Sequence, residues 1–163
     1  MHLTIYTDYA LRVMLMLNVA PNRLVTIKEA AERYDISRNH LVKVVQQLAA
    51  HGYVQSVRGR NGGIRLGRPA SQINIGELVR LTEENFNLVE CFDRATDACL
   101  ISPACRLRRV LTNARDAFLR ELDAVTLADI AANAEPLRRL LFIPSREGRP
   151  VRAIRSAART TQR

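Results

Sequence analysis

The feature that most constrains the fold is the run over residues 37–66, in which an amphipathic helical pattern is followed by a glycine-rich basic turn. Ser37 is a suitable N-cap, and Gly52 supplies a left-handed residue that ends a helix. The segment Arg58-Gly59-Arg60-Asn61-Gly62-Gly63 has turn chemistry and separates two β-prone stretches, residues 53–57 and 64–66. The apolar stripe of the predicted helix consists of Leu41, Val44, Val45 and Leu48. The run therefore predicts a helix followed by a β-hairpin.

Another short helix is predicted directly before this one. Thr26-x-x-Glu29 is a capping box that opens a helix reaching about Tyr34, and Asp35-Ile36 forms the turn. Two short helices joined by a tight turn make a helix-turn-helix unit. Upstream, Thr7 and Asp8 can cap a helix that ends at Pro21-Asn22, and downstream Asn74-x-x-Glu77 begins a further one.

A long amphipathic helix is predicted over residues 104–125. Its apolar positions recur at steps of three and four residues: Leu107, Leu111, Ala114, Phe118, Leu122 and Val125. About 22 residues make a rod of roughly 33 Å, and a rod with one apolar stripe needs a partner surface. The stripe can pack on its own chain, but the small remaining core favours a helix-mediated homodimer.

These patterns predict a mainly α fold with a small β-hairpin wing, that is, a winged helix-turn-helix plus a long dimerisation helix. The predicted parts are a DNA-binding domain (1–82), a cysteine-containing loop (83–103), a dimerisation helix with a C-terminal helical segment (104–143) and a disordered basic tail (144–163).

Positive charge lies at the two ends of the chain, whose formal net charge is +9. Lys and Arg outnumber Asp and Glu by 11 to 5 in residues 1–80 and by 6 to 1 in residues 144–163. Such an excess fits nucleic acid, anionic lipid or a solvated surface, and the tail either adds phosphate contacts or is an inert end. The longest apolar stretch, residues 10–20, is too short and too interrupted to cross a bilayer, and no signal-peptide pattern begins the chain. We expect a cytoplasmic protein without membrane contact.

The helix after Ser37 carries side chains suited to reading double-stranded DNA. A recognition helix needs hydrogen-bonding residues near its N-terminus, on the face opposite its apolar stripe. Arginine can bind guanine, and asparagine or glutamine can bind adenine, through paired hydrogen bonds. The candidates are Ser37, Arg38, Asn39, His40, Lys43 and Gln46, of which Arg38, Asn39 and His40 are expected to carry most base contacts.

The predicted hairpin adds a second set of DNA contacts. Arg58 and Arg60 flank glycines, which allow the backbone to approach the sugar-phosphate surface, and arginine suits a narrow minor groove. Gly62 and Gly63 can instead, or in addition, be required for positive φ in a tight turn. The predicted contacts outside the recognition helix are Thr26, Arg58, Arg60, Asn61, Gly62 and Gly63.

Three cysteines follow the pattern Cys91-x7-Cys99-x5-Cys105. An odd number in a reducing compartment argues against a disulfide framework, and the paired C-x-x-C hooks common in zinc sites are absent. Inert thiols, a zinc site, a thiol redox switch and an iron-sulfur cluster remain open, and three cysteines within fifteen polar residues favour the cluster. The sequence lacks a glycine-rich phosphate loop and metalloprotease spacing, so an enzyme is not expected.

The same residues carry a resemblance to a known family. The recognition segment Leu41-Val42-Lys43, the following Gly52-Tyr53-Val54 and the wing resemble the winged-helix superfamily of bacterial iron-sulfur regulators that includes IscR and NsrR. The likeness covers roughly residues 1–143. Phe86-Asn87-Leu88-Val89-Glu90-Cys91-Phe92 and the cysteine pattern are similar to the NsrR family of nitric-oxide-sensing repressors. The histidine that follows the last cysteine in the IscR pattern is missing from residues 106–110.

The resemblance implies a repressor whose operator is released when nitric oxide reacts with an iron-sulfur cluster, 4Fe-4S or 2Fe-2S, on Cys91, Cys99 and Cys105. The segment Tyr6-Thr7-Asp8-Tyr9-Ala10-Leu11-Arg12 resembles the one whose aspartate reaches the cluster of the other subunit, which makes Asp8 a candidate fourth ligand. An acid in a first helical turn also complements the helix dipole. The alternative functions are a cluster-free thiol-sensing regulator and an IscR-type regulator of iron-sulfur status.

Overall fold

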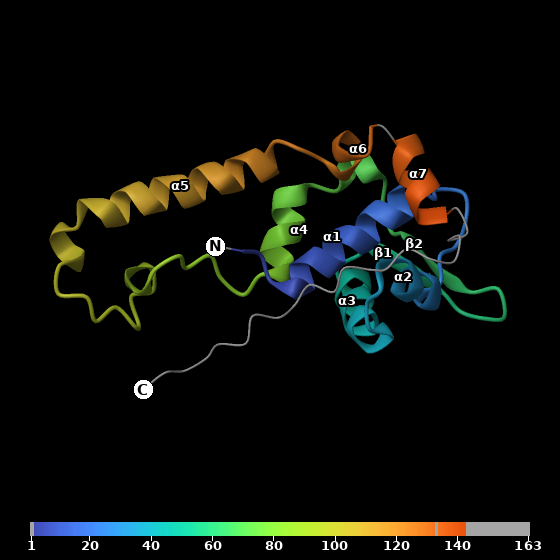
Figure 1. Ribbon diagram of the computed structural model, residues 1–163, viewed down its shortest axis with the longest axis horizontal. Coiled ribbons are helices and arrows are strands. Elements are labelled where there is room, and N and C mark those ends of the chain that lie inside the picture. The colour runs from blue at the N-terminus through green and yellow to red at the C-terminus, as the bar shows by residue number, and fades with distance from the viewer. Residues whose placement is uncertain (1, 133, 143–163) are drawn as a thin grey trace.

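The computed structural model describes residues 2–132 and 134–142, and in these ranges helices surround one antiparallel hairpin (Figure 1). The α-helices are α1 (Ile5–Asn18), α2 (Ile27–Tyr34), α3 (Arg38–Ala50), α4 (Ile75–Thr82), α5 (Arg106–Asp123), α6 (Leu127–Ile130) and α7 (Ala134–Phe142). The strands are β1 (Val54–Val57) and β2 (Gly63–Leu66), and the 3-10 turns are η1 (Ala70–Gln72), η2 (Glu90–Phe92) and η3 (Ser102–Ala104). The predicted fold class, mainly helical with a hairpin wing, is confirmed.

Helix α1 begins earlier than the sequence predicted. Thr4 is the N-cap, and its hydroxyl accepts a hydrogen bond from the backbone N–H of Thr7 at 3.2 Å. Thr7 is fully buried and its hydroxyl donates to the Thr82 hydroxyl on α4 at 2.9 Å. The prediction that Thr7 and Asp8 cap this helix was wrong, because Thr4 offers the same capping hydroxyl three residues upstream. Asp8 consequently lies in the first turn of α1.

The helix-turn-helix forms around local signals. The Thr26 hydroxyl accepts from the Glu29 N–H at 3.0 Å, and Asp35 adopts the left-handed conformation, with φ of 54°, between α2 and α3. Ser37 occupies the N-cap of α3, but its side chain makes no capping hydrogen bond. After α3 the chain turns at Gly52, whose φ of 72° is the predicted left-handed stop.

The hairpin pairs Val54 with Leu66 and Val57 with Gly63, and Val25 bridges to Ile64 along the other edge of β2. The wing turn takes its positive φ, 117°, at Gly59. The expectation of positive φ at Gly62 and Gly63 was wrong, since these glycines are required by close packing. A Cβ at Gly62 would lie 2.4 Å from the Val57 carbonyl oxygen, and one at Gly63 would lie 2.8 Å from that of Val25.

One hydrophobic core joins the N-terminal helices, the hairpin and the last two helices. Its fully buried large side chains include Met14, Met16, Leu41, Leu48, Ile73, Leu78 and Leu127. Leu127 of α6 and Leu141 of α7 belong to the same cluster as α1, α3 and α4. The segment after α5 therefore returns to pack on the N-terminal part of the chain, as Figure 1 shows.

Helix α5 projects from this core. It spans Arg106–Asp123 rather than 104–125, and none of its residues, all of which the structure describes, is buried. Leu107 and Val110 on it are 62% and 60% exposed. Figure 1 shows the N-terminal half of the helix extending far from α1 and α3. The predicted boundaries at residues 82, 103 and 143 stay predictions, and the predicted basic tail lies outside the described residues.

Candidate DNA-binding face and cysteine loop

Helix α3 exposes the polar side chains that the sequence assigned to DNA. Ser37, Arg38, Asn39, His40, Lys43 and Gln46 are all exposed. The opposite face is buried through Leu41, Val44, Val45 and Leu48. This arrangement suits entry of the helix into a major groove, because the hydrogen-bonding face is free while the apolar face fixes the helix to the core.

Two tyrosines of α1 support α3 directly. The Tyr6 hydroxyl donates to the Lys43 carbonyl oxygen at 3.2 Å, and burial raises the pKa of Tyr6. The ring of Tyr9 stacks on that of His40, with centroids 6.4 Å apart. Tyr6 and Tyr9 were not predicted to support α3, although their spacing of three residues places them on one side of a helix.

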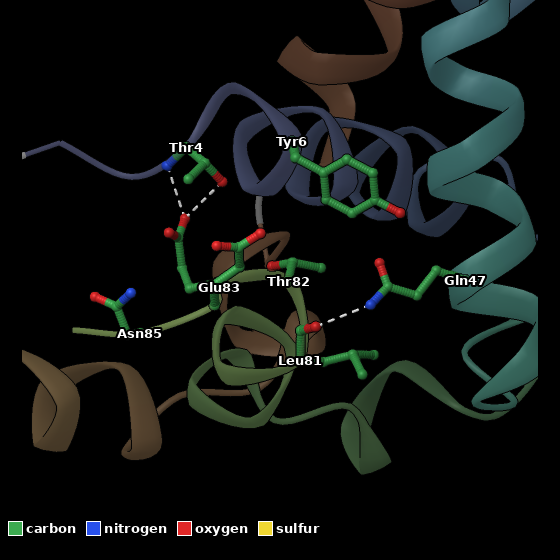
Figure 2. A pocket seen from close by; sticks show the side chains of 8 residues that line it. Thr4, Tyr6, Gln47, Leu81, Thr82, Glu83 and Asn85 are labelled. Carbon is green, nitrogen blue, oxygen red and sulfur yellow. Dashed lines mark hydrogen bonds between the residues drawn. The ribbon is translucent and has the colours of Figure 1, made fainter. Parts of the chain in front are cut away.

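A polar cavity of 530 Å³ lies behind the recognition helix, where α1, α3 and α4 meet (Figure 2). Gln47 of α3 donates to the Leu81 carbonyl oxygen across it at 3.0 Å. The carboxylate of Glu83 accepts from the backbone N–H of Thr4 at 2.7 Å and from its hydroxyl at 2.9 Å. These bonds tie the start of α1 and the back of α3 to the end of α4, immediately before the cysteine loop.

The hairpin displays its basic residues at the tip. Arg58, Arg60 and Asn61 are exposed in the turn between β1 and β2. Farther along the hairpin, Arg65 donates from Nε to the Gln55 side-chain oxygen at 2.8 Å. Thr26 is exposed at the start of α2, and its hydroxyl is already engaged in capping that helix.

The three cysteines lie in separate parts of the loop between α4 and α5. Cys91 is in η2, Cys99 is exposed, and Cys105 is the N-cap of α5, where its sulfur accepts from the Arg108 N–H at 3.4 Å. All three thiols are free. Among the described residues no three His, Cys, Asp or Glu side chains are grouped closely enough to hold a metal ion.

Acidic side chains organise this loop by accepting hydrogen bonds. The Asp97 carboxylate accepts from the Ser102 hydroxyl at 2.6 Å and from the Cys99 N–H at 3.1 Å, and these bonds hold the pKa of Asp97 below its usual value. Glu90 accepts from the Ala98 N–H at 3.0 Å. Arg115 of α5 lies over the Phe92 ring at 5.1 Å. The loop is thus folded against the first half of α5.

The chemistry of the donor set fits an iron-sulfur cluster. Thiolates are the ligands that such clusters use, and the cysteines are free and at least partly accessible. The chain as described does not bring the three sulfurs together, so it supplies suitable ligands without an assembled site.

Asp8 is paired within its own helix. Its carboxylate meets Arg12 at 2.8 Å, and the two side chains are 46% and 39% exposed. Within the described part of the chain, Asp8 and the cysteines do not form a group of side chains that could hold a metal ion.

A search of the described helices for a membrane-spanning segment found none with the necessary length and hydropathy.

Comparisons with known proteins place the chain in a family. Residues 3–133 match the Rrf2 family, described as iron-dependent transcriptional regulators. The HTH-type transcriptional regulator NsrR of Bacillus licheniformis is 52% identical over 142 residues, which is 86% of this chain and 99% of that protein. NsrR of Bacillus subtilis is also 52% identical, over 86% of this chain and 97% of its own length.

Solved structures of two regulators share the fold. CymR, the global cysteine regulator of B. subtilis, superimposes with a TM-score of 0.66 at 26% identity, over 81% of this chain and 97% of CymR. IscR of T. potens gives a TM-score of 0.67 at 25% identity, over 85% of this chain and 91% of that one. The chain therefore belongs to the Rrf2 family of winged-helix transcriptional regulators, and it is a DNA-binding regulator rather than an enzyme.

Proposed function

We propose that the protein is a cytoplasmic, homodimeric repressor that senses nitric oxide through an iron-sulfur cluster. Three free thiols in a loop next to an uncovered amphipathic helix carry the proposal. In this scheme Cys91, Cys99 and Cys105 hold the cluster, of the 4Fe-4S or 2Fe-2S type, together with the partner's Asp8. The relatives named NsrR support the nitric-oxide signal.

Helix α5 supplies the dimer surface in this proposal. Leu107 and Val110 are mostly exposed, and Leu111 and Phe118 line an apolar hollow of 520 Å³ beneath the residues that precede Cys91. Burial of this stripe by a second copy would remove it from water, which is the main driving force of association. The dimer would also set the spacing of the two recognition helices, as half-sites one DNA turn apart require.

The DNA-binding residues of the proposal lie on α3, on the wing and, for Thr26, at the start of α2; Gly62 and Gly63 are half-buried and the others are exposed. Arg38, Asn39 and His40 at the start of α3 read bases, with Lys43 and Gln46 beside them. Ser37, Thr26, Asn61, Gly62 and Gly63 contact the sugar-phosphate backbone. Arg58 and Arg60 enter the adjacent minor groove from the wing tip.

Asp8 provides the link between the proposed sensor and α3. When bound, a cluster supplies iron that reacts with nitric oxide, and a carboxylate is a weaker iron ligand than a thiolate. Arg12 contacts both oxygens of the Asp8 carboxylate, so a cluster held by the other subunit would compete with Arg12 for this group. Tyr6 and Tyr9, on either side of Asp8 in sequence, contact Lys43 and His40. A change in this turn of α1 therefore acts on the recognition helix.

The test uses full-length protein purified without oxygen. We expect iron, acid-labile sulfide and a dimeric mass, and loss of affinity for a duplex selected by the protein from random sequences when nitric oxide is added. Cys99→Ser is expected to lose the iron. Asp8→Ala is expected to keep iron but to lose it faster in air, whereas the control Glu135→Ala, which removes the carboxylate of another exposed i,i+4 ion pair, with Arg139 on α7, behaves as the wild type.

Two results would contradict the proposal. A colourless protein whose DNA affinity changes on treatment with peroxide would establish the cluster-free thiol switch instead. Equal DNA affinity before and after nitric oxide, in a protein that holds iron and sulfide, would remove nitric oxide as the signal and leave an IscR-type role.

A further inference from the structure

A crease lined by arginines runs between the turn after α1, the base of the hairpin and α7. It consists of three hollows of 480, 270 and 220 Å³, which share Pro21 in the turn after α1. Among the described residues, the charged side chains that line the three hollows are Arg23, Arg65, Arg68 and Arg138, with no Asp or Glu. We call this surface the arginine crease.

Two of these arginines are anchored in a way that leaves their outer nitrogens available. Arg65 on β2 uses Nε to bind Gln55 at 2.8 Å, and Arg138 on α7 uses Nε to bind the Val19 carbonyl oxygen at 2.8 Å. Both side chains belong to exposed residues, and within the described part of the chain no bond from their Nη atoms is formed. A guanidinium fixed at Nε with two free Nη groups is suited to a phosphate.

The other two arginines are fixed in place by packing. Arg68 lies over the Tyr53 ring at 3.9 Å, and its buried Nε has no hydrogen-bond partner. Arg23 lies over Phe142 at 4.2 Å and forms two bonds with Glu29, at 2.6 and 3.0 Å. Glu29 neutralises Arg23, so the uncompensated charge of the crease comes from Arg65, Arg68 and Arg138.

The position of the crease points to its ligand. Arg65 lies two residues beyond Gly63, where β2 leaves the wing turn that carries Arg58 and Arg60. In Figure 1 the hairpin and α7 lie at the end of the molecule opposite the free end of α5. In the proposed dimer, in which α5 pairs at the centre, this is the outer end of each protomer.

We infer that the arginine crease binds the phosphate backbone of DNA that flanks the operator, outside the bases read by α3 and the wing. Each contact displaces condensed counterions, so the effect is independent of sequence and depends on salt. The inference rests on the proposed homodimer for the direction in which the DNA leaves.

The test compares two duplexes bound by full-length protein. One is the shortest duplex that retains full base readout after selection from random sequences, and the other carries ten random base pairs on each side. We expect the extended duplex to bind at least about tenfold more tightly at 0.1 M salt, with a log–log salt slope steeper by about 0.9 for each added phosphate contact. Arg65→Gln/Arg138→Gln, which retains Arg68, is expected to remove most of this difference and to leave binding to the short duplex unaffected.

The controls separate the crease from general charge and from folding. Arg120→Gln removes one charge from an exposed position on α5 and should retain the flank effect. Arg65→Gln alone loses only the bond to Gln55. It should reduce the affinity difference between the two duplexes by about half as much as the double variant does, and it serves as the test if the double variant unfolds. Sedimentation of the complex with the short duplex gives the number of protein chains bound. A failure of the proposed homodimer is therefore distinguished from a failure of the flank contact.

Equal affinity and slope of the wild type for the two duplexes would overturn the inference. An equal loss on both duplexes in the double variant would also overturn it, since the arginines would then belong to the core contact. Altered transcription by RNA polymerase in the double variant, with unchanged flank binding, would assign the crease to an acidic protein surface instead.

Discussion

Arg80 of α4 holds both carboxylate oxygens of Asp123 at the end of α5, at 2.5 and 2.7 Å. Asn74 adds a bond from its side-chain amide to the Asp123 backbone carbonyl at 2.7 Å. Because α5 buries none of its residues, this junction and the neighbouring Leu122 and Val125 hold its C-terminal end to the core. The junction therefore fixes the direction in which the proposed dimer helix leaves the DNA-binding part.

Gly76→Ala is expected to disturb this junction. A Cβ at Gly76 would lie 1.8 Å from Asp123 Oδ1 and 2.9 Å from Arg80 Nη1, so the carboxylate must move. We expect a loss of about 1–3 kcal/mol in the free energy of unfolding, measured with urea. In Gly76→Ala/Asp123→Ala the new methyl group no longer meets a carboxylate. The loss in the free energy of unfolding of this double variant should therefore be smaller than the sum of the losses in the two single variants. Strict additivity would show that Asp123 is not what the new methyl group meets.

The same pair predicts a dependence of stability on pH. The hydrogen bond from Arg80 holds the pKa of Asp123 below its ordinary value. A carboxyl group with a lowered folded-state pKa stabilises the fold above about pH 4, and this contribution is lost as the pH falls through the lowered value. The difference in unfolding free energy between wild type and Arg80→Gln should be constant from pH 6 to 8 and shrink below pH 4. A difference that persists at pH 3 would mean that Arg80 acts through packing.

Thr7→Val is expected to loosen the attachment of α1 to α4. Thr7 is fully buried and Thr82 is 8% exposed, and their hydroxyls are bonded at 2.9 Å. Thr82 keeps its bond to the Leu78 carbonyl oxygen at 3.1 Å in the variant, so the loss should be about 1 kcal/mol in urea unfolding. Thr4→Val removes the N-cap hydroxyl of the same helix and serves as the comparison. Unchanged stability of Thr7→Val would show that the pair contributes nothing net.

Asn39→Ala and Arg58→Gln should separate base reading from phosphate binding. Loss of a paired hydrogen bond to adenine should cost about 1–3 kcal/mol on the selected duplex and leave binding to random DNA nearly unchanged. Arg58→Gln should weaken binding to both DNAs and lower the salt slope by about 1. Fluorescence anisotropy titrations at several salt concentrations measure both effects. If Asn39→Ala weakens binding to the selected duplex and to random DNA equally, Asn39 contacts phosphate rather than a base.

Tyr34 should titrate well above the ordinary range of a tyrosine. Burial raises the pKa of Tyr34 to about 12, and its hydroxyl donates to the Arg12 carbonyl oxygen at 2.9 Å. Because the folded-state pKa is raised, the stabilisation is complete below pH 10 and is lost as the pH rises toward 12. Ultraviolet difference spectra of wild type and Tyr34→Phe isolate this residue. A Tyr34 titration near pH 10 in the folded protein would contradict the burial of its hydroxyl.

The sequence by itself determined the parts of this protein that depend on neighbouring residues. The local patterns are the N-cap hydroxyl of Thr26, the left-handed Gly52, the stripe of α3 and the basic wing turn. They are readable because helix caps and turns form within a few residues. The second half of the predicted capping box is not among them, since the Glu29 carboxylate pairs with Arg23. These patterns were sufficient for the winged helix-turn-helix class and for the exposed polar face of α3. They also placed Cys91 and Cys99 in an irregular segment and Cys105 at the start of the long helix, but the role of the three cysteines stays a prediction.

Only the tertiary structure decided which distant residues meet. Thr7 is buried because Thr82, 75 positions later, supplies an acceptor, although its own surroundings suggested a cap. Arg138 reaches Val19 across 119 positions and forms one end of the arginine crease. Gly62 and Gly63 are needed for close approach of other backbone segments rather than for their own φ. Such contacts arise from the packing of the helices and the hairpin around one core, which periodicity and spacing along the chain do not encode.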